Sequence, residues 1–218
     1  PPGMPSPSPH KHAAREIAQF FHSRSSLRPR LAMLLGSGHA SIANQLKEKI
    51  ALHGEDVPGV SLPSPILVGL LEGVPVAVAD APFAAFEGLT AAELALPVRV
   101  LKAIGCEVLI VTAGAASLSQ QIELGTIAVV EDHLNFSGLH PLVGPNDDNV
   151  GPRFPDMNEP YAREWIDVAR DVAFKVFFRA VDRILFEFVG DVFVDGLFLL
   201  IHRNEIVTHH ARLERSLV

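Results

Sequence analysis

The sequence is poor in features on which whole classes of protein depend. It has one cysteine, Cys106, so no internal disulfide can form and a disulfide-stapled secreted scaffold is excluded. A reducing compartment suits a lone thiol, which we interpret as a small buried hydrophobic group rather than a reactive nucleophile. Basic residues are also few, because the sequence has 18 Lys and Arg against 25 Asp and Glu, which gives a net charge of −7. This balance argues against a protein that binds nucleic acid by neutralising phosphates.

Long uncharged apolar runs are missing too. Charged side chains interrupt the most apolar region, residues 172–201, whereas a membrane-spanning helix needs about 20 mostly uncharged residues. We therefore expect no membrane span. The opening PPGMPSPSP cannot form the apolar helix of a signal peptide, and it predicts a flexible tail over residues 1–11. We expect an intracellular, cytoplasmic protein. An organellar location stays open, because residue 1 is not methionine and an upstream targeting segment could have been removed.

Ten histidines raise the possibility of a metal site, above all His202, His209 and His210. Adjacent histidines point to different faces of a helix or strand, and neither an H-x-x-x-H spacing nor a second cysteine accompanies them. The sequence therefore predicts no metal.

The elements that are present alternate between strands and helices. At 48% hydrophobic and 20% charged residues, the composition is that of one globular domain, expected over residues 12–218. Periodicity predicts helices over 12–23, 41–50, 90–104 and 161–183, and strands over 31–35, 66–71, 74–78, 108–112 and 126–130. Residues 135–160 are rich in Pro, Gly, Asn and Asp, which predicts a long loop used for function or for an interface. This order indicates an α/β fold with a parallel or mixed sheet.

A glycine turn follows the first predicted strand. In Leu35-Gly36-Ser37-Gly38, backbone amides and a hydroxyl at a helix start could hold phosphate. A plain turn between a strand and a helix is the commoner reading of such a segment taken alone.

Further motifs follow in a fixed order along the chain. They are PVRVL at 97–101, VTAGAASL at 111–118, EDHLN at 131–135, GPNDD at 144–148 and GPRFPDM at 151–157. Together with the glycine turn they resemble the trimeric purine nucleoside phosphorylases, whose pattern runs G-S-G, T-N-A-A-G-G-L, D-H-I-N, G-P-N-D and R-F-P. The resemblance implies a three-layer α/β fold with a central mixed sheet flanked by helices. It also implies a homotrimer that converts a purine nucleoside and phosphate into the free base and ribose 1-phosphate, with no cofactor beyond that co-substrate.

The resemblance also implies roles for individual residues. Ser37 and Gly114 correspond to phosphate-binding positions, and Phe154 to a phenylalanine that reaches into a neighbouring subunit's site. The full set of ribose and base positions is Phe86, Ala115, Phe154, Glu187 and Leu200. His133, inside the D-H-x-N motif, is interpreted as a structural residue of that turn.

Several family groups are replaced. The family's G-R-F-H-x-Y-E-G motif reads APFAAFEG over residues 81–88, so Pro82 and Ala84 stand for its phosphate-binding arginine and histidine, and Phe86 for its tyrosine. The family's V-x-G-H-x-G loop is absent near Pro65, and Ala113 replaces an asparagine. On the same register, the chain ends before the threonine–asparagine pair that binds the purine in this family.

Two functions follow from this pattern. The first is a degenerate family member that serves as a non-catalytic structural or regulatory subunit of a homotrimer or a larger assembly. The second is an active phosphorylase that has rebuilt its phosphate site from other residues, such as Arg99 or Arg153. The missing cationic groups favour the first.

Overall fold

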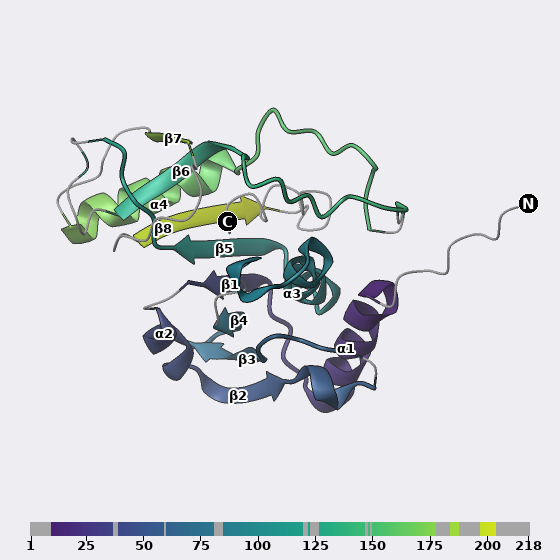
Figure 1. The fold of residues 1–218 in the computed structure, drawn as a ribbon. Coiled ribbons are helices and arrows are strands. Elements are labelled where there is room, and N and C mark those ends of the chain that lie inside the picture. Colours follow the sequence, from purple (N-terminus) through teal and green to yellow (C-terminus); the bar gives the residue numbers. More distant parts are fainter. Residues whose placement is uncertain are drawn as a thin grey trace, which may run out of the picture.

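The computed structural model describes residues 10–36, 39–58, 60–80, 85–119, 122, 127–146, 148, 150–177, 184–187 and 197–203. Within them one eight-stranded sheet has the order β2-β3-β4-β1-β5-β8-β6-β7 (Figure 1). The strands are β1 (Leu31–Leu35), β2 (Lys47–Leu52), β3 (Ile66–Leu71), β4 (Val74–Asp80), β5 (Val108–Ala113), β6 (Ile127–Leu134), β7 (Ile184–Glu187) and β8 (Leu197–Arg203). The helices are α1 (His10–Arg24), α2 (Ala40–Asn44), α3 (Ala91–Ala103) and α4 (Arg163–Phe177), with short 3₁₀ turns η1 (Gly54–Asp56) and η2 (Ala85–Glu87).

The three central strands of the sheet run parallel. Leu35 of β1 lies opposite Asp80 of β4 and opposite Thr112 of β5, so the carboxyl ends of all three strands meet. We call this end of the sheet, marked by Gly36 and Gly114, the glycine-turn edge. β8 runs antiparallel to β5 and parallel to β6, so β6 begins near the glycine-turn edge and ends at the opposite one, the far edge.

Helices cover both faces of the sheet in three layers. On β1, Ala32 and Leu34 belong to the same buried cluster as Ile17 and Phe21 of α1, to which α3 also contributes. The alternate residue Leu35 packs in a second cluster with Ala43 and Val78, under α2. Side chains of a strand alternate between faces, so this division follows from the sequence of β1. The predicted three-layer fold with a central mixed sheet is confirmed.

Most of the predicted elements are present. The predicted hairpin is β3 and β4, joined by Glu72 and Gly73 with φ angles of 48° and 82°, the backbone that two-residue hairpin turns favour. The helix predicted over 90–104 is α3, whose Thr90 cap accepts from the Glu93 amide while the Glu93 carboxylate accepts from the Thr90 amide. The described part of 135–160 contains neither helix nor strand, as predicted.

Other boundaries differ from prediction. α1 begins at His10, two residues earlier than the predicted helix and inside the predicted tail. α4 covers Arg163–Phe177, and the rest of the predicted 161–183 helix lies outside the described residues. β6 continues to Leu134 because its second half pairs with β7, so the start of the D-H-x-N motif is strand.

The helix predicted over 41–50 is wrong in its second half. α2 ends at Asn44, and Lys47–Leu52 forms β2, an edge strand paired with β3. Leu, Lys and Glu favour a helix locally, but the open edge of the hairpin provides a partner that overrides this weak preference. Charged Lys47, Glu48 and Lys49 suit an exposed sheet edge. No helix in the described part of the chain is long and apolar enough to cross a membrane.

Candidate functional site

The glycine-turn edge is built by an unusually close approach of β1 to β5. The Gly36 amide donates to the Thr112 carbonyl oxygen at 2.8 Å and to Thr112 Oγ1 at 3.1 Å. A Cβ on residue 36 would stand 2.6 Å from that carbonyl oxygen and 3.1 Å from the Ala113 Cα. Glycine is therefore required by space at this position, which supports the structural reading of the turn without removing the functional one.

A histidine and a threonine meet beside this turn. His39 Nδ1 lies 3.2 Å from Thr112 Oγ1, and the His39 amide donates to the Gly36 carbonyl oxygen at 3.3 Å. Thr112 is buried in β5, with 5% of its surface exposed, whereas His39 is half-buried. The hydroxyl therefore ties the segment after β1 to the end of β5. Sequence reasoning missed both residues, although each adjoins a glycine motif.

The predicted phosphate and ribose positions gather only partly at this edge. Gly114 directly follows β5 and is exposed, and Ala115 is half-buried against the main core. Phe86 lies in η2, six residues after the end of β4, and is 61% exposed. Ser37 lies outside the described residues, as do Pro82 and Ala84.

Two predicted base-binding positions lie away from Gly114 in the sheet. Glu187 ends β7 and pairs with Leu134, at the far edge. Leu134 lies seven residue steps after Ile127 along β6, which at the usual strand rise is about 23 Å. Leu200 lies inside the sheet, opposite Val111 of β5. Gly114 and its chain neighbour Ala115 thus follow β5 at the glycine-turn edge, whereas Glu187 lies at the far edge.

The loop after β6 is organised by its own side chains. Asn135 Oδ1 accepts from the Ser137 amide at 2.9 Å, and Asn135 Nδ2 donates to the Leu139 carbonyl oxygen at 3.1 Å. Farther along, Arg153 Nη1 donates to the carbonyl oxygens of Leu142 and Gly144, at 2.7 and 2.6 Å. These bonds give polar residues of the D-H-x-N and R-F-P motifs a role in shaping the loop.

Apolar side chains on this loop face solvent. Figure 1 shows the loop extending past the end of β6, to the right in that view, whereas α2 and the glycine-turn edge lie to the left. Phe154 is 86% exposed, Val143 81% and Phe136 66%. Phe154, predicted to contact ribose or base, is thus an exposed residue of the loop that leaves the sheet at the far edge.

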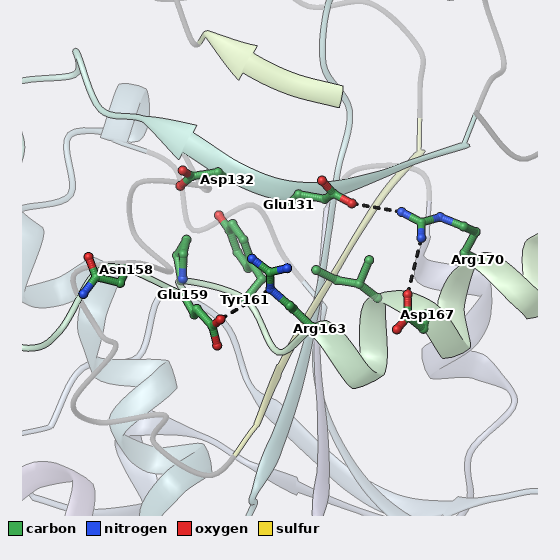
Figure 2. Close-up of a pocket in the computed structure, with 10 residues that line it drawn as sticks. Glu131, Asp132, Asn158, Glu159, Tyr161, Arg163, Asp167 and Arg170 are labelled. Carbon is green, nitrogen blue, oxygen red and sulfur yellow. Dashed lines mark hydrogen bonds and ion pairs between the residues drawn. The ribbon is translucent and has the colours of Figure 1, made fainter. Parts of the chain in front are cut away.

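A cavity of about 330 Å³ lies between β6, α4 and the segment 158–161 (Figure 2). Arg170 bridges Glu131 at 2.9 Å and Asp167 at 3.3 Å, and Arg163 lies 3.4 Å from Glu159. These pairs connect α4 to β6 and to the loop. Because the arginines lining the cavity already face carboxylates, we interpret the charges as structural. No local pattern in the sequence signals the Arg170–Glu131 pair, which joins residues 39 positions apart.

His133 is buried and contacts Tyr161, one of the residues that line this cavity. Its Nδ1 is 2.8 Å from the Tyr161 hydroxyl, and the two rings meet edge-on with centroids 5.6 Å apart. The exposed fractions are 7% for His133 and 2% for Tyr161. This pair joins the end of β6 to the start of α4 and agrees with the structural role expected for His133.

Metal and thiol chemistry find little support in the described residues. Among them, no three His, Cys, Asp or Glu side chains gather as metal ligands. The His202 side chain, His209 and His210 lie outside that description. Burial raises the pKa of the Cys106 thiol to about 12, which leaves little thiolate at neutral pH.

Comparisons with known proteins match most of this chain. The sequence model of the phosphorylase superfamily matches residues 30–183, a range that excludes Glu187 and Leu200. Purine nucleoside phosphorylase 1 of Geobacillus stearothermophilus is 35% identical over 167 residues, which are 74% of this chain and 61% of that relative. Purine nucleoside phosphorylase 1 of Bacillus subtilis is 32% identical over 169 residues, 75% of this chain and 62% of the relative. The chain spans about three fifths of the length of these two relatives.

Solved structures share the fold. A Schistosoma purine nucleoside phosphorylase in complex with hypoxanthine superimposes with a TM-score of 0.76, covering 97% of this chain and 96% of that one at 21% identity. At that identity the likeness speaks for the fold alone. The ordered motifs, the three-layer mixed sheet and the sequence matches agree, and the chain therefore belongs to the phosphorylase superfamily as a member of its purine nucleoside phosphorylase family.

Proposed function

We propose that this chain is a non-catalytic purine nucleoside phosphorylase-like subunit, with a structural or regulatory role in an assembly. The observation that carries the proposal is the segment APFAAFEG at 81–88. It follows directly on Asp80, which pairs with Leu35 at the glycine-turn edge. Proline and alanine thus occupy the two positions at which the family resemblance expects an arginine and a histidine for phosphate.

The expected loss of phosphate affinity is large. A hydrogen bond to a charged group contributes roughly 1.5–3 kcal/mol. Two such bonds amount to about 3–6 kcal/mol, or roughly 10²–10⁴-fold in the dissociation constant. Because phosphorolysis requires a held and oriented phosphate, weakened binding lowers the reaction rate at any given phosphate concentration.

The direct test is phosphate-dependent release of hypoxanthine from inosine. We expect no turnover above background from the folded wild-type chain. The double variant Pro82→Arg/Ala84→His restores both cationic groups, and tighter phosphate binding by it in titration calorimetry would support the assignment of these positions. Robust turnover by the wild-type protein would refute the non-catalytic role.

The rival function is phosphorolysis of a purine nucleoside to the free base and ribose 1-phosphate. One observation favours it, since His39 supplies an imidazole beside Gly36 and Thr112. The arginines considered from sequence are less suited. Arg153 is engaged by two carbonyl oxygens in the loop beyond the far edge, and Arg99 lies in the last five residues of α3, which lead towards the amino end of β5.

The partner in the assembly is proposed to be further copies of this chain or other subunits. The 86% exposure of Phe154 supports this, because an exposed phenylalanine on the loop beyond the far edge is available to meet another subunit. Native mass spectrometry would distinguish a homotrimer, a mixed assembly and a monomer. We expect Phe154→Ala to weaken association while leaving the fold intact, and a stable monomer at all concentrations would contradict the proposal.

A further inference from the structure

His39 contacts Thr112, and the family resemblance assigned a functional role to neither residue. The two residues meet where β1 and β5 end, with His39 Nδ1 3.2 Å from Thr112 Oγ1. The close contact of Gly36 with the Thr112 backbone holds the ends of β1 and β5 together at the same point. A half-buried imidazole is thereby held beside the exposed Gly114 turn, to which Thr112 is joined by Ala113 alone.

The hydrogen bonds of Thr112 Oγ1 bear on which ring nitrogen of His39 carries the proton. The Gly36 amide donates to Thr112 Oγ1 at 3.1 Å and occupies one of its lone pairs. The threonine hydroxyl keeps a hydrogen to donate and a second lone pair, and our inference takes the arrangement in which it donates to Nδ1 of His39. An imidazole that accepts at Nδ1 carries its hydrogen on Nε2, on the opposite side of the ring from Thr112. In that tautomer Nε2–H is a donor on the side of the ring away from Thr112 Oγ1.

Charge at this edge is scarce. Among the described residues 36, 39, 80 and 112–115, His39 is the basic residue and Asp80 the acidic one. A tetrahedral oxyanion beside Gly114 would thus find, among these residues, one side-chain donor able to carry charge, on a ring already oriented by a buried hydroxyl. Hydrogen bonds to charged groups are the stronger kind.

We propose that His39 is an anion-binding residue, donating from Nε2 to an oxyanion of the phosphate type, and that Thr112 is its positioning residue. The inference deepens the proposed function, because it concerns the same weakened phosphate site. Binding of the anion does not require that turnover follow. Binding and turnover are measured separately, so failure of the one is distinguishable from failure of the other.

The experiment is NMR titration of the full chain with inorganic phosphate, and with sulfate as a second probe. Long-range proton–nitrogen spectra of the histidine rings report the tautomer, and we expect His39 in the Nε2–H form. His39→Asn keeps a polar atom near the Nδ1 position but removes the outward donor. We expect it to weaken phosphate binding about tenfold or more. His22→Asn, at an exposed histidine on α1, is the matched control and should bind as the wild type does.

Variants at Thr112 separate positioning from folding. Thr112→Val removes the hydroxyl at nearly constant shape, and it should mix the His39 tautomers and weaken anion binding. Thr112→Ser restores the hydroxyl and should recover both, whereas a purely structural role would not move the tautomer. Unchanged phosphate affinity in His39→Asn, or no response of the wild-type His39 signals to phosphate, would overturn the proposal. An unchanged tautomer in folded Thr112→Val would overturn the role of Thr112.

Discussion

Replacing Gly36 by alanine tests whether the close contact of β1 with β5 builds the glycine-turn edge. The added Cβ would meet the Thr112 carbonyl oxygen at 2.6 Å, whereas ordinary contacts of this kind begin at 3.4 Å. The strands would have to separate by about 0.8 Å at this point. That movement stretches the 2.8 Å bond from the Gly36 amide to the same oxygen past the normal range, together with the 3.1 Å bond to Thr112 Oγ1.

The free-energy cost follows from these two effects. Overpacking a well-packed site costs about 1–3 kcal/mol, because neighbouring backbone must shift. Losing the backbone hydrogen bond adds about 1 kcal/mol. The neighbouring atoms are main chain of β5, a central strand, and cannot rotate away, so we expect Gly36→Ala to lower the free energy of unfolding by about 2–4 kcal/mol. For a chain of this size that is a fall in Tm of roughly 5–15 °C.

The measurement is denaturant unfolding followed by circular dichroism, with a thermal melt alongside. Gly73→Ala is the control, since residue 73 has a φ of 82° and a Cβ added there would meet nothing within 4 Å. Gly73→Ala should lower the free energy of unfolding by about 1–2 kcal/mol, because alanine is strained in a left-handed backbone conformation, but it introduces no clash. If Gly36→Ala costs no more than Gly73→Ala, the steric reasoning for the glycine-turn edge is wrong.

Three further predictions concern other parts of the molecule. Because burial raises the pKa of Cys106 to about 12 from 9.0, the unfolded chain loses this proton first, and stability should fall between pH 9 and pH 12. From pH 9 to pH 10 the free energy of unfolding should fall by about 1 kcal/mol. Stability of Cys106→Ala should depend less steeply on pH, and equal slopes in the two proteins would contradict the argument. Tyr161→Phe removes the buried hydroxyl 2.8 Å from His133 and should cost about 1–3 kcal/mol in denaturant unfolding; a neutral effect would rule out that contact. Arg153→Met removes the bonds to Leu142 and Gly144 at an exposed site, so protease cleavage within the loop should accelerate while Tm changes little. An unchanged cleavage rate would show that these two bonds do not hold the loop.

Local sequence signals were sufficient where one segment determined its own structure. The Glu72-Gly73 turn adopts left-handed backbone angles that glycine makes accessible, so the hairpin could be predicted from two residues between apolar runs. The Thr90–Glu93 capping box likewise marks the start of α3 without reference to distant residues. The ordered motifs from the glycine turn to Met157 were also sufficient for the family.

Lys47–Leu52 shows where local signals fail. Its residues favour a helix, and only the neighbouring hairpin makes it a strand. The register of β6 and β7 is a second feature that local signals do not provide, because the Leu134–Glu187 pair joins residues far apart in the chain.

The sequence by itself determined the family and the central strands of the sheet, since each depends on residue type and order. Tertiary structure alone decided that β6 runs opposite to β5, so that the loop after β6 leaves the sheet at the far edge, and that His39 meets Thr112 across 73 positions of chain. The physical reason is that strand direction and long-range hydrogen bonds depend on which backbones pair, and pairing is settled by the packing of the whole sheet.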